Sequence, residues 1–140
     1  LAGLLKDQGK YDEATPIYER SLVIREKALG PEHPAVATAL NNLAELLKIQ
    51  GKYDEAKPLY ERAVEIGEKA LGPEHPDLAI RLSNLAELLK IQGKYDEAKP
   101  LSERAISIGE KTLGPEHPDV AGGLNNLAEL LRAQGKYDEA

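Results

Sequence analysis

The sequence contains no cysteine, methionine, tryptophan or phenylalanine, and tyrosine is its only aromatic residue. Without cysteine, the chain can form neither a disulfide framework nor a thiolate metal site. This composition is compatible with the cytoplasm, which is the compartment we favour. No apolar run approaches the roughly 18 residues that a membrane span needs. No signal peptide is visible, but the sequence begins at Leu1, which leaves open where the natural N-terminus lies.

Basic residues are in the minority. The 140 residues include 18 basic and 24 acidic ones, and the formal net charge is −6. A protein that binds phosphate backbones normally carries a basic stripe, and this sequence has none. The charge therefore argues against nucleic-acid partners and against docking on an anionic membrane surface. The length suits one ordinary domain.

The sequence repeats itself with a period of 42 residues. The string Gly-Pro-Glu-His-Pro begins at Gly30, Gly72 and Gly114, and Gly-Lys-Tyr-Asp-Glu-Ala begins at Gly9, Gly51, Gly93 and Gly135. Residues 43–84 and 85–126 are identical at 34 of 42 positions. Such likeness indicates either recent duplication or a consensus design, and the sequence does not separate these two origins.

Each repeat contains two amphipathic helical patterns. Leu40, Leu43, Ala44 and Leu47 follow the spacing that places apolar side chains on one face of a helix. Ala56, Leu59, Tyr60, Ala63 and Ile66 do the same in the second pattern. We predict helices at about 12–29, 35–50, 54–71, 77–92, 96–113 and 119–134. Residues 1–8 would end a truncated helix, and 137–140 would begin another.

Glycine and proline mark the ends of these helices. Gly51 follows the first helix, where a left-handed backbone suits a residue without a Cβ atom. Gly72-Pro73 ends the second helix, and Pro76 can occupy the first position of the next one. Pro58 lies about one turn inside the second helix, where it either removes a hydrogen bond or shifts the helix start.

One helical hairpin cannot bury its own apolar faces, whereas stacked hairpins can. The sequence therefore predicts a single all-α array with a partial repeat 1 at 1–34, repeats 2 and 3 at 35–76 and 77–118, and a partial repeat 4 at 119–140.

The repeats resemble those of a known family. Leu43-Ala44, Gly51, Tyr53, Glu55-Ala56, Tyr60 and Ala63 match the signature of the tetratricopeptide repeat (TPR). The 42-residue period, the Asn-Asn-Leu-Ala string and the Leu-Gly-Pro-Glu-His-Pro connector are similar to the kinesin light chain subtype. This resemblance covers the whole chain and implies a right-handed superhelical solenoid of stacked antiparallel helix hairpins. It implies a scaffold that binds proteins, but one such fold serves many partners.

Three residues depart from the repeat pattern. Ser102 stands where Tyr18 and Tyr60 stand in the other repeats, so a large core ring is lost there. Gly122 and Gly123 enter the last of the first-type helices, where each costs up to about 1 kcal/mol relative to alanine. We therefore predict that the C-terminal hairpin is the least stable.

No set of residues predicts catalysis, a cofactor or a metal, and we expect a protein that is not an enzyme. His33, His75 and His117 occupy equivalent places in successive repeats, roughly 10 Å apart at normal helix packing distances, so they cannot share a zinc ion. We interpret them as loop residues near helix starts. Glu65 and Lys69 are interpreted as a solvated i,i+4 pair.

The faces of the first-type helices opposite the buried stripes are polar, and in TPR-like arrays such faces line the concave groove. We predict that a peptide binds there. The candidates in repeat 2 are Asn41, Asn42, Glu45, Lys48 and Ile49; in repeat 3, Ile80, Ser83, Asn84, Glu87, Lys90 and Ile91; and in the last repeat, Asn125, Asn126, Glu129 and Arg132.

Asn42, Asn84 and Asn126 form a ladder at equivalent positions. An amide carries both a donor and an acceptor, so it can pair with the backbone of an extended peptide without reading its side chains. The alternative is that these residues bond neighbouring helices and stiffen the stack. Glu and Lys or Arg alternate on the same face, so we carry over no preference for an acidic peptide or a C-terminal carboxylate. The two-carboxylate clamp of chaperone-binding repeats needs basic residues where Asn41, Ser83 and Gly122 stand.

Our leading interpretation is a peptide-binding interaction module. A second one is a structural module whose copies stack head to tail, because both end repeats are cut and leave apolar faces uncovered. An excised or designed scaffold without a ligand of its own also fits the sequence.

Overall fold

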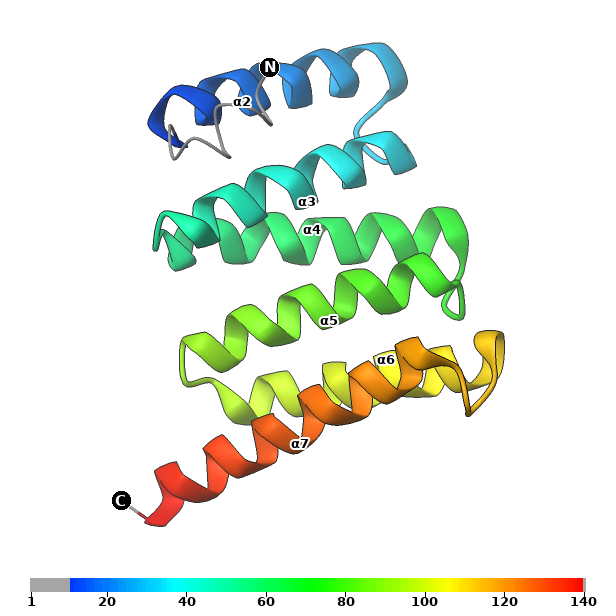
Figure 1. The fold of residues 1–140 in the computed structure, drawn as a ribbon. Helices are drawn as coiled ribbons and strands as arrows, with labels where there is room; N and C mark the ends of the chain where they lie inside the picture. Colours follow the sequence, from blue (N-terminus) through cyan, green and yellow to red (C-terminus); the bar gives the residue numbers. More distant parts are fainter. Residues whose placement is uncertain (1–10, 140) are drawn as a thin grey trace. The chain divides into compact units, whose positions relative to one another are not determined.

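The computed structural model describes residues 11–139, which form six helices and no strand. In chain order they are α2 (Tyr11–Leu29), α3 (Pro34–Ile49), α4 (Tyr53–Leu71), α5 (Pro76–Ile91), α6 (Tyr95–Leu113) and α7 (Pro118–Glu139) (Figure 1). The all-α class is confirmed, and every helix begins one residue before its predicted start. The truncated helix predicted at 1–8 lies outside the described residues.

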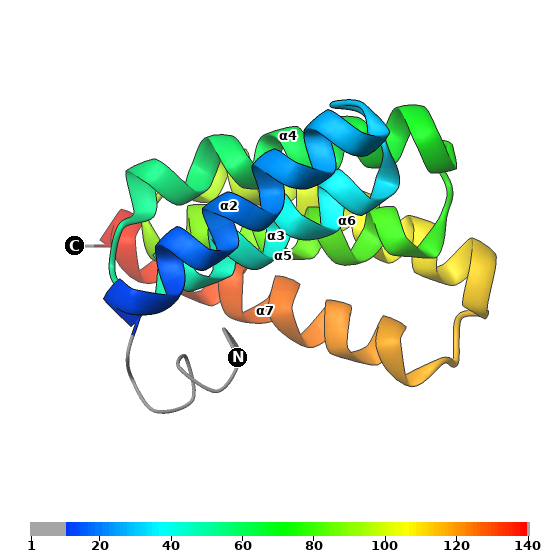
Figure 2. The same ribbon diagram turned by 90° about the horizontal axis from the view of Figure 1, so that it is seen from above.

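The chain folds as two compact units, Leu1–Ala70 and Leu71–Ala140. The first unit holds α2, α3 and all but the last residue of α4, and in it α2 packs against α3. The second unit holds α5, α6 and α7, and in it α6 packs against both of the other helices. Figure 2 shows the same helices from a second direction.

The first-type helices begin with a histidine cap. The Nδ1 atoms of His33, His75 and His117 accept hydrogen bonds from the backbone N–H two residues later, at 3.0, 3.1 and 3.1 Å. Each histidine thereby satisfies one of the N–H groups that a helix start leaves without a partner, and a proline follows it at the first helical position. The interpretation of these residues as loop histidines near helix starts is confirmed.

The helices α3 and α5 end in the same glycine motif. Gly51 and Gly93 adopt φ angles of 79° and 78°, which are left-handed and suit glycine. The next residues, Lys52 and Lys94, donate N–H groups to carbonyls of the last helical turn at 2.8 Å. This is the bonding pattern of a Schellman cap. The prediction of a left-handed Gly51 is confirmed.

Gly135 behaves differently from Gly51 and Gly93, although the same residues surround it. Its φ is not positive, and α7 runs through it to Glu139. The predicted helix end at 134 is therefore wrong. A turn of this kind is stabilised when the following helix packs back on the preceding one, and only five residues follow Gly135 in this sequence.

Pro58 lies inside α4, which begins at Tyr53, and Pro16 and Pro100 occupy the equivalent places in α2 and α6. Two effects of Pro58 were expected, a shifted helix start or a lost hydrogen bond. The helix start is not shifted. Instead α4 loses one helical hydrogen bond, because proline has no N–H.

The predicted apolar stripes of α3 and α4 are buried apart from one residue. In α3, Leu40, Leu43, Ala44 and Leu47 are all buried, and in α4 only Leu59 of the predicted set is partly exposed. Helix α7 differs, since Leu124 and Leu131 are 50% and 43% exposed. The equivalent leucines of α5, Leu82 and Leu89, are buried.

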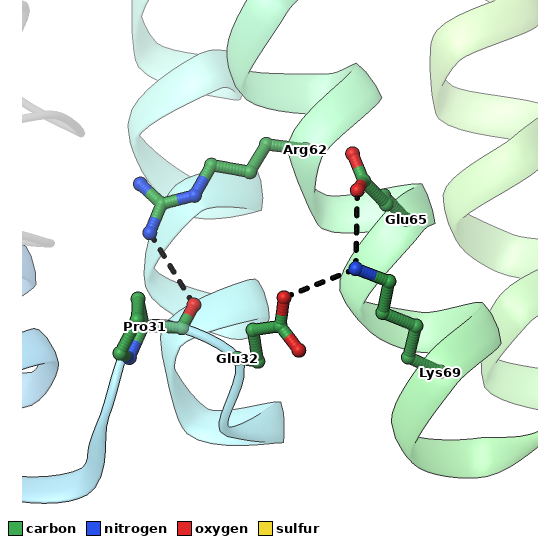
Figure 3. A network of polar contacts seen from close by, with 5 residues as sticks. All are labelled: Pro31, Glu32, Arg62, Glu65 and Lys69. Atoms are coloured by element: carbon green, nitrogen blue, oxygen red, sulfur yellow. Dashed lines mark hydrogen bonds and ion pairs between the residues drawn. The ribbon is translucent and has the colours of Figure 1, made fainter.

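Charged side chains tie the loop before α3 to α4 (Figure 3). Arg62 donates to the carbonyl of Pro31 at 3.3 Å and pairs with Glu26 of α2 at 3.2 Å. Lys69 pairs with Glu32 at 3.0 Å and with Glu65 at 3.3 Å. The hydrogen bond that the Lys69 ammonium donates to Glu32, together with the one that it donates to Glu65, raises the pKa of Lys69. The Glu65–Lys69 pair is solvent-exposed, which confirms its interpretation as a solvated i,i+4 pair.

Candidate functional site

The second unit contains a polar depression between α5 and α7, which we call the polar hollow. It has a volume of about 120 Å³. Helix α5 contributes Ser83, Ala86, Glu87 and Lys90, α6 contributes Ser102, and α7 contributes Gly123, Asn126, Glu129 and Leu130. Its walls therefore come from the two first-type helices, and its base comes from the helix that packs against both.

Ser102 explains why this hollow exists. Its equivalent in the first unit, Tyr60, is 2% exposed and is among the largest fully buried side chains. Ser102 is also buried, at 9% exposure, but its side chain occupies far less space than a tyrosine ring. The missing ring leaves open the space next to it, because surrounding structure collapses only partly around a small residue.

A second depression, the apolar hollow, lies further toward the starts of α5 and α7. It has a volume of about 340 Å³ and shares Ser83, Gly123 and Asn126 with the polar hollow. Its other lining residues are Pro76, Ala79, Ile80 and Asn84 of α5; Ala105, Ile106, Gly109 and Leu113 of α6; and Pro118, Asp119, Val120 and Gly122 of α7. Aliphatic side chains and glycines predominate.

The charges of the two hollows are unevenly distributed. Lys90 and Glu129 form an ion pair of 3.7 Å that joins α5 to α7 beside the polar hollow. With Glu87, this hollow has two carboxylates and one ammonium group, a formal charge of −1. Asp119 is the one charged residue of the apolar hollow. Arg81 lines neither hollow, and burial lowers the pKa of its guanidinium while nearby Asp77 raises it in part.

The structure brings together part of the predicted peptide-binding set. In the second unit, Ile80, Ser83, Asn84, Glu87, Lys90, Asn126 and Glu129 line the hollows. Ile91, Asn125 and Arg132 are exposed but line neither one. In the first unit, α3 exposes Asn42 and Ile49, while Asn41, Glu45 and Lys48 are half-buried.

Sequence reasoning missed the base of the site. The predicted set lies on the first-type helices alone. The base is formed by residues of α6, a second-type helix, namely Ser102, Ile106, Gly109 and Leu113. The absence of a tyrosine at 102 was the available signal for the hollow in the sequence. That signal is incomplete, because a missing ring opens a hollow only where neighbouring helices do not close it. Gly122 was predicted to lie on the groove face, and Gly123 was predicted only to weaken the helix. Both glycines line the apolar hollow and add no side chain to its α7 wall.

Replacing Gly122 with alanine is expected to raise the free energy of unfolding by up to about 1 kcal/mol, since alanine favours the helix and a Cβ at this position meets no atom within 4 Å. Gly123→Ala is the matched comparison. Its Cβ would lie 3.1 Å from Cγ1 of Ile106, so part of the gain is lost to displacement of that side chain. Urea unfolding measures both variants. Equal stabilisation by the two would contradict this reading of the α7 wall.

The described part of the chain contains no group of three or more His, Asp or Glu side chains placed to hold a metal ion. None of its helices is long and apolar enough to cross a membrane.

These features define an all-helical repeat protein of stacked hairpins, a class whose members generally act as scaffolds that bind other proteins. The Tetratricopeptide repeat family model matches residues 1–69, 36–108 and 80–140. The chain therefore belongs to the tetratricopeptide repeat family, and its resemblance to the kinesin light chain subtype is confirmed.

Several known proteins are similar to it. The crystal structure of a Podosopora anserina protein described as a kinesin light chain with nearly identical TPR-like repeats is 32% identical, with a TM-score of 0.87 over 99% of this chain and 66% of that one. BtubC (BKLC) from P. vanneervenii is 30% identical, with a TM-score of 0.87 over 100% of this chain and 56% of that one. Nephrocystin-3 of Xenopus laevis is 50% identical over 44 residues, which are 31% of this chain and 3% of nephrocystin-3.

Proposed function

We propose that the chain is a protein–protein interaction module that holds an extended peptide segment against α5 and α7 of its second unit. The observation that carries this proposal is the pair of adjoining hollows, which two facing helices line with polar groups above a base formed by α6. A peptide side chain needs a depression and a peptide backbone needs donors and acceptors, and this surface offers both.

Asn84 and Asn126 are the residues that would hold the peptide backbone. Asn84 lines the apolar hollow from α5, and Asn126 lines both hollows from α7. Asn126 is exposed and Asn84 is half-buried. Asn42 is exposed at the equivalent place of α3 in the first unit. This assignment follows the proposed division into repeats at 35–76 and 77–118.

Peptides selected by display on the whole chain provide the test. Replacing Asn84 and Asn126 together with alanine should weaken their binding about tenfold or more, because each lost hydrogen bond contributes about 0.5–1.5 kcal/mol. Calorimetry or fluorescence anisotropy gives the affinities. Asn42→Ala is made separately to ask whether Asn42 contributes to binding.

Asn125→Ala is the matched control, since it removes the same side chain from the same helix at a position that lines neither hollow. It should leave affinity unchanged. Circular dichroism establishes that helicity is preserved in each variant. If peptides bind the double variant as tightly as the unaltered chain, the asparagines have a structural role and the proposal fails.

The apolar face of α7 supports a second candidate function, the head-to-tail association of copies. This face consists of Leu124, Ala128 and Leu131, all of which are exposed, whereas their equivalents in α5 are buried. In the first unit, Ile24 of α2 is 56% exposed, whereas its equivalents Ile66 and Ile108 are each 3% exposed. A contact between two different faces of this kind generates open chains of molecules.

Light scattering over a range of protein concentrations tests this association. The mass should rise with concentration, and Leu124→Glu combined with Leu131→Glu should abolish the rise. A constant monomer mass at every concentration would eliminate head-to-tail association and leave peptide binding unaffected.

A further inference from the structure

The same ion pair joins a second-type helix to the connector before the preceding first-type helix in both units. In the first unit, Lys69 of α4 pairs with Glu32 at 3.0 Å (Figure 3). In the second unit, Lys111 of α6 pairs with Glu74 at 2.9 Å. Each pair joins residues 37 positions apart. The contact therefore belongs to the way in which the two helices of a repeat pack together.

Both halves of this ion pair are present a further time in the chain without each other. Lys27 of α2 holds the place of Lys69, and Glu116, in the connector before α7, holds the place of Glu32. Both side chains are exposed, and neither forms an ion pair or a hydrogen bond with a residue of 11–139. In the same register, the 140-residue sequence contains neither an acceptor for Lys27 nor a donor for Glu116.

A second pair of charges is left in the same way. Arg62 of α4 pairs with Glu26 of α2 at 3.2 Å. The equivalent places are held by Arg20 of α2 and Glu110 of α6, which are exposed and have no side-chain partner within residues 11–139. The first unit therefore offers two cations on α2, and the second unit offers two carboxylates at the connection from α6 to α7. These two surfaces are complementary in charge.

Exposed apolar side chains accompany the charges on both surfaces. Ile66 lines the same small depression as Glu32 and Lys69 and is 3% exposed, whereas its equivalent Ile24 is 56% exposed. On α5, which packs against α6, Leu82 is 0% exposed, whereas its equivalent Leu124 on α7 is 50% exposed. A helix that lay on α7 as α6 lies on α5 would remove this apolar surface from water.

We infer that a second copy of the chain docks its α2 on α7 in the place that α6 holds on α5, with Lys27 paired to Glu116 and Arg20 paired to Glu110. The inference rests on the second candidate function, head-to-tail association, and adds the register and the residues of the contact. By repeat position, residues 1–8 of the docked copy are equivalent to 127–134 of α7, and the place beside α2 holds only one of these segments. The contact therefore uses the second half of α2 and the start of α7.

Charge exchange tests this register. Lys27→Glu and Glu116→Lys should each weaken association about threefold to tenfold, since an attraction between exposed groups becomes a repulsion of similar size. A 1:1 mixture of the two variants should associate nearly as tightly as the unaltered chain, because every contact between the two variants joins opposite charges. Sedimentation velocity over a range of protein concentrations gives the dissociation constants. The same exchange at Arg20 and Glu110 is made in parallel.

Lys52→Glu and Glu61→Lys are the matched controls. They make the same charge changes at exposed residues, of which Lys52 precedes α4 and Glu61 lies within it, so neither belongs to a docking surface. Both should leave association unchanged. Circular dichroism establishes that every variant remains helical, and association of the unaltered chain should weaken as salt is raised.

Zero-length carbodiimide coupling gives an independent measurement, because it joins an ammonium group to a carboxylate only when the two groups touch. In a mixture of isotopically labelled and unlabelled chains, mass spectrometry should find Lys27 coupled to Glu116 with one residue from each kind of chain. Lys69 and Glu32, which pair at 3.0 Å, should couple within single chains and provide the positive control.

The outcomes separate this inference from the function on which it rests. If Leu124→Glu with Leu131→Glu abolishes association but the charge exchanges do not affect it, the register is overturned and head-to-tail association stands. Failure of the mixed variants to associate, or coupling of Lys27 to other carboxylates in place of Glu116, would also overturn the register. If the chain is a monomer at every concentration, head-to-tail association fails and the inference fails with it.

Discussion

Replacement of Tyr60 with serine is expected to lower the free energy of unfolding by about 3–5 kcal/mol, the range typical for the loss of a large buried aromatic side chain. Tyr60 is 2% exposed, so almost its whole ring is packed against other residues. Serine loses these contacts and leaves a void in their place. Urea unfolding followed by circular dichroism measures the change.

The reverse substitution, Ser102→Tyr, is the matched experiment because the second unit already carries the small residue at this repeat position. Filling a void of about 120 Å³ would contribute up to about 3 kcal/mol if the void were closed. The polar hollow is open to water, so we expect a gain of about 1–2 kcal/mol. A destabilised Ser102→Tyr protein would contradict the view that the hollow occupies the place of a missing ring.

Replacement of Leu82 with alanine should lower the free energy of unfolding by about 2–5 kcal/mol, whereas Leu124→Ala should change it by less than about 0.5 kcal/mol. The two leucines hold the same place in successive repeats, but Leu82 is 0% exposed and Leu124 is 50% exposed. The loss of unfolding free energy depends on how much buried surface is removed and on the size of the cavity left behind. An exposed leucine has little buried surface to lose, and its truncation leaves no cavity.

Leu40→Ala extends this comparison to the first unit, where the equivalent leucine is also 0% exposed, and it should be as damaging as Leu82→Ala. Unfolding in urea is measured for all three variants. If Leu124→Ala is as destabilising as Leu82→Ala, then α7 buries that face in solution, and self-association at high concentration becomes the first explanation to examine.

The helices were predictable because their signals are local. The apolar spacing of Leu40, Leu43, Ala44 and Leu47 and the glycine after the helix are read within one repeat, and both were confirmed. Gly135 shows the limit of such signals. It has the same neighbours in sequence as Gly51, yet it remains helical, since the packing that stabilises a turn comes from residues that follow it.

The candidate site was predictable only on its polar side. Ser83, Asn84 and Asn126 could be placed on one face of their helices by counting residues, and they do line the hollows. Asn125 followed from the same reasoning and lines neither hollow. Which side of a helix faces a neighbouring helix depends on how the helices pack, and a helical wheel does not contain that information.

The sequence alone was sufficient for the helix content, the 42-residue repeat and the family, since each depends on patterns within one or two repeats. The depth and chemistry of the hollows depended on the three-dimensional structure. Ser102 of α6 lies 20 and 21 positions before Gly122 and Gly123 of α7. The three small residues open a single surface only because α6 packs between α5 and α7. Missing atoms create space only where the surrounding helices are held apart by their other contacts.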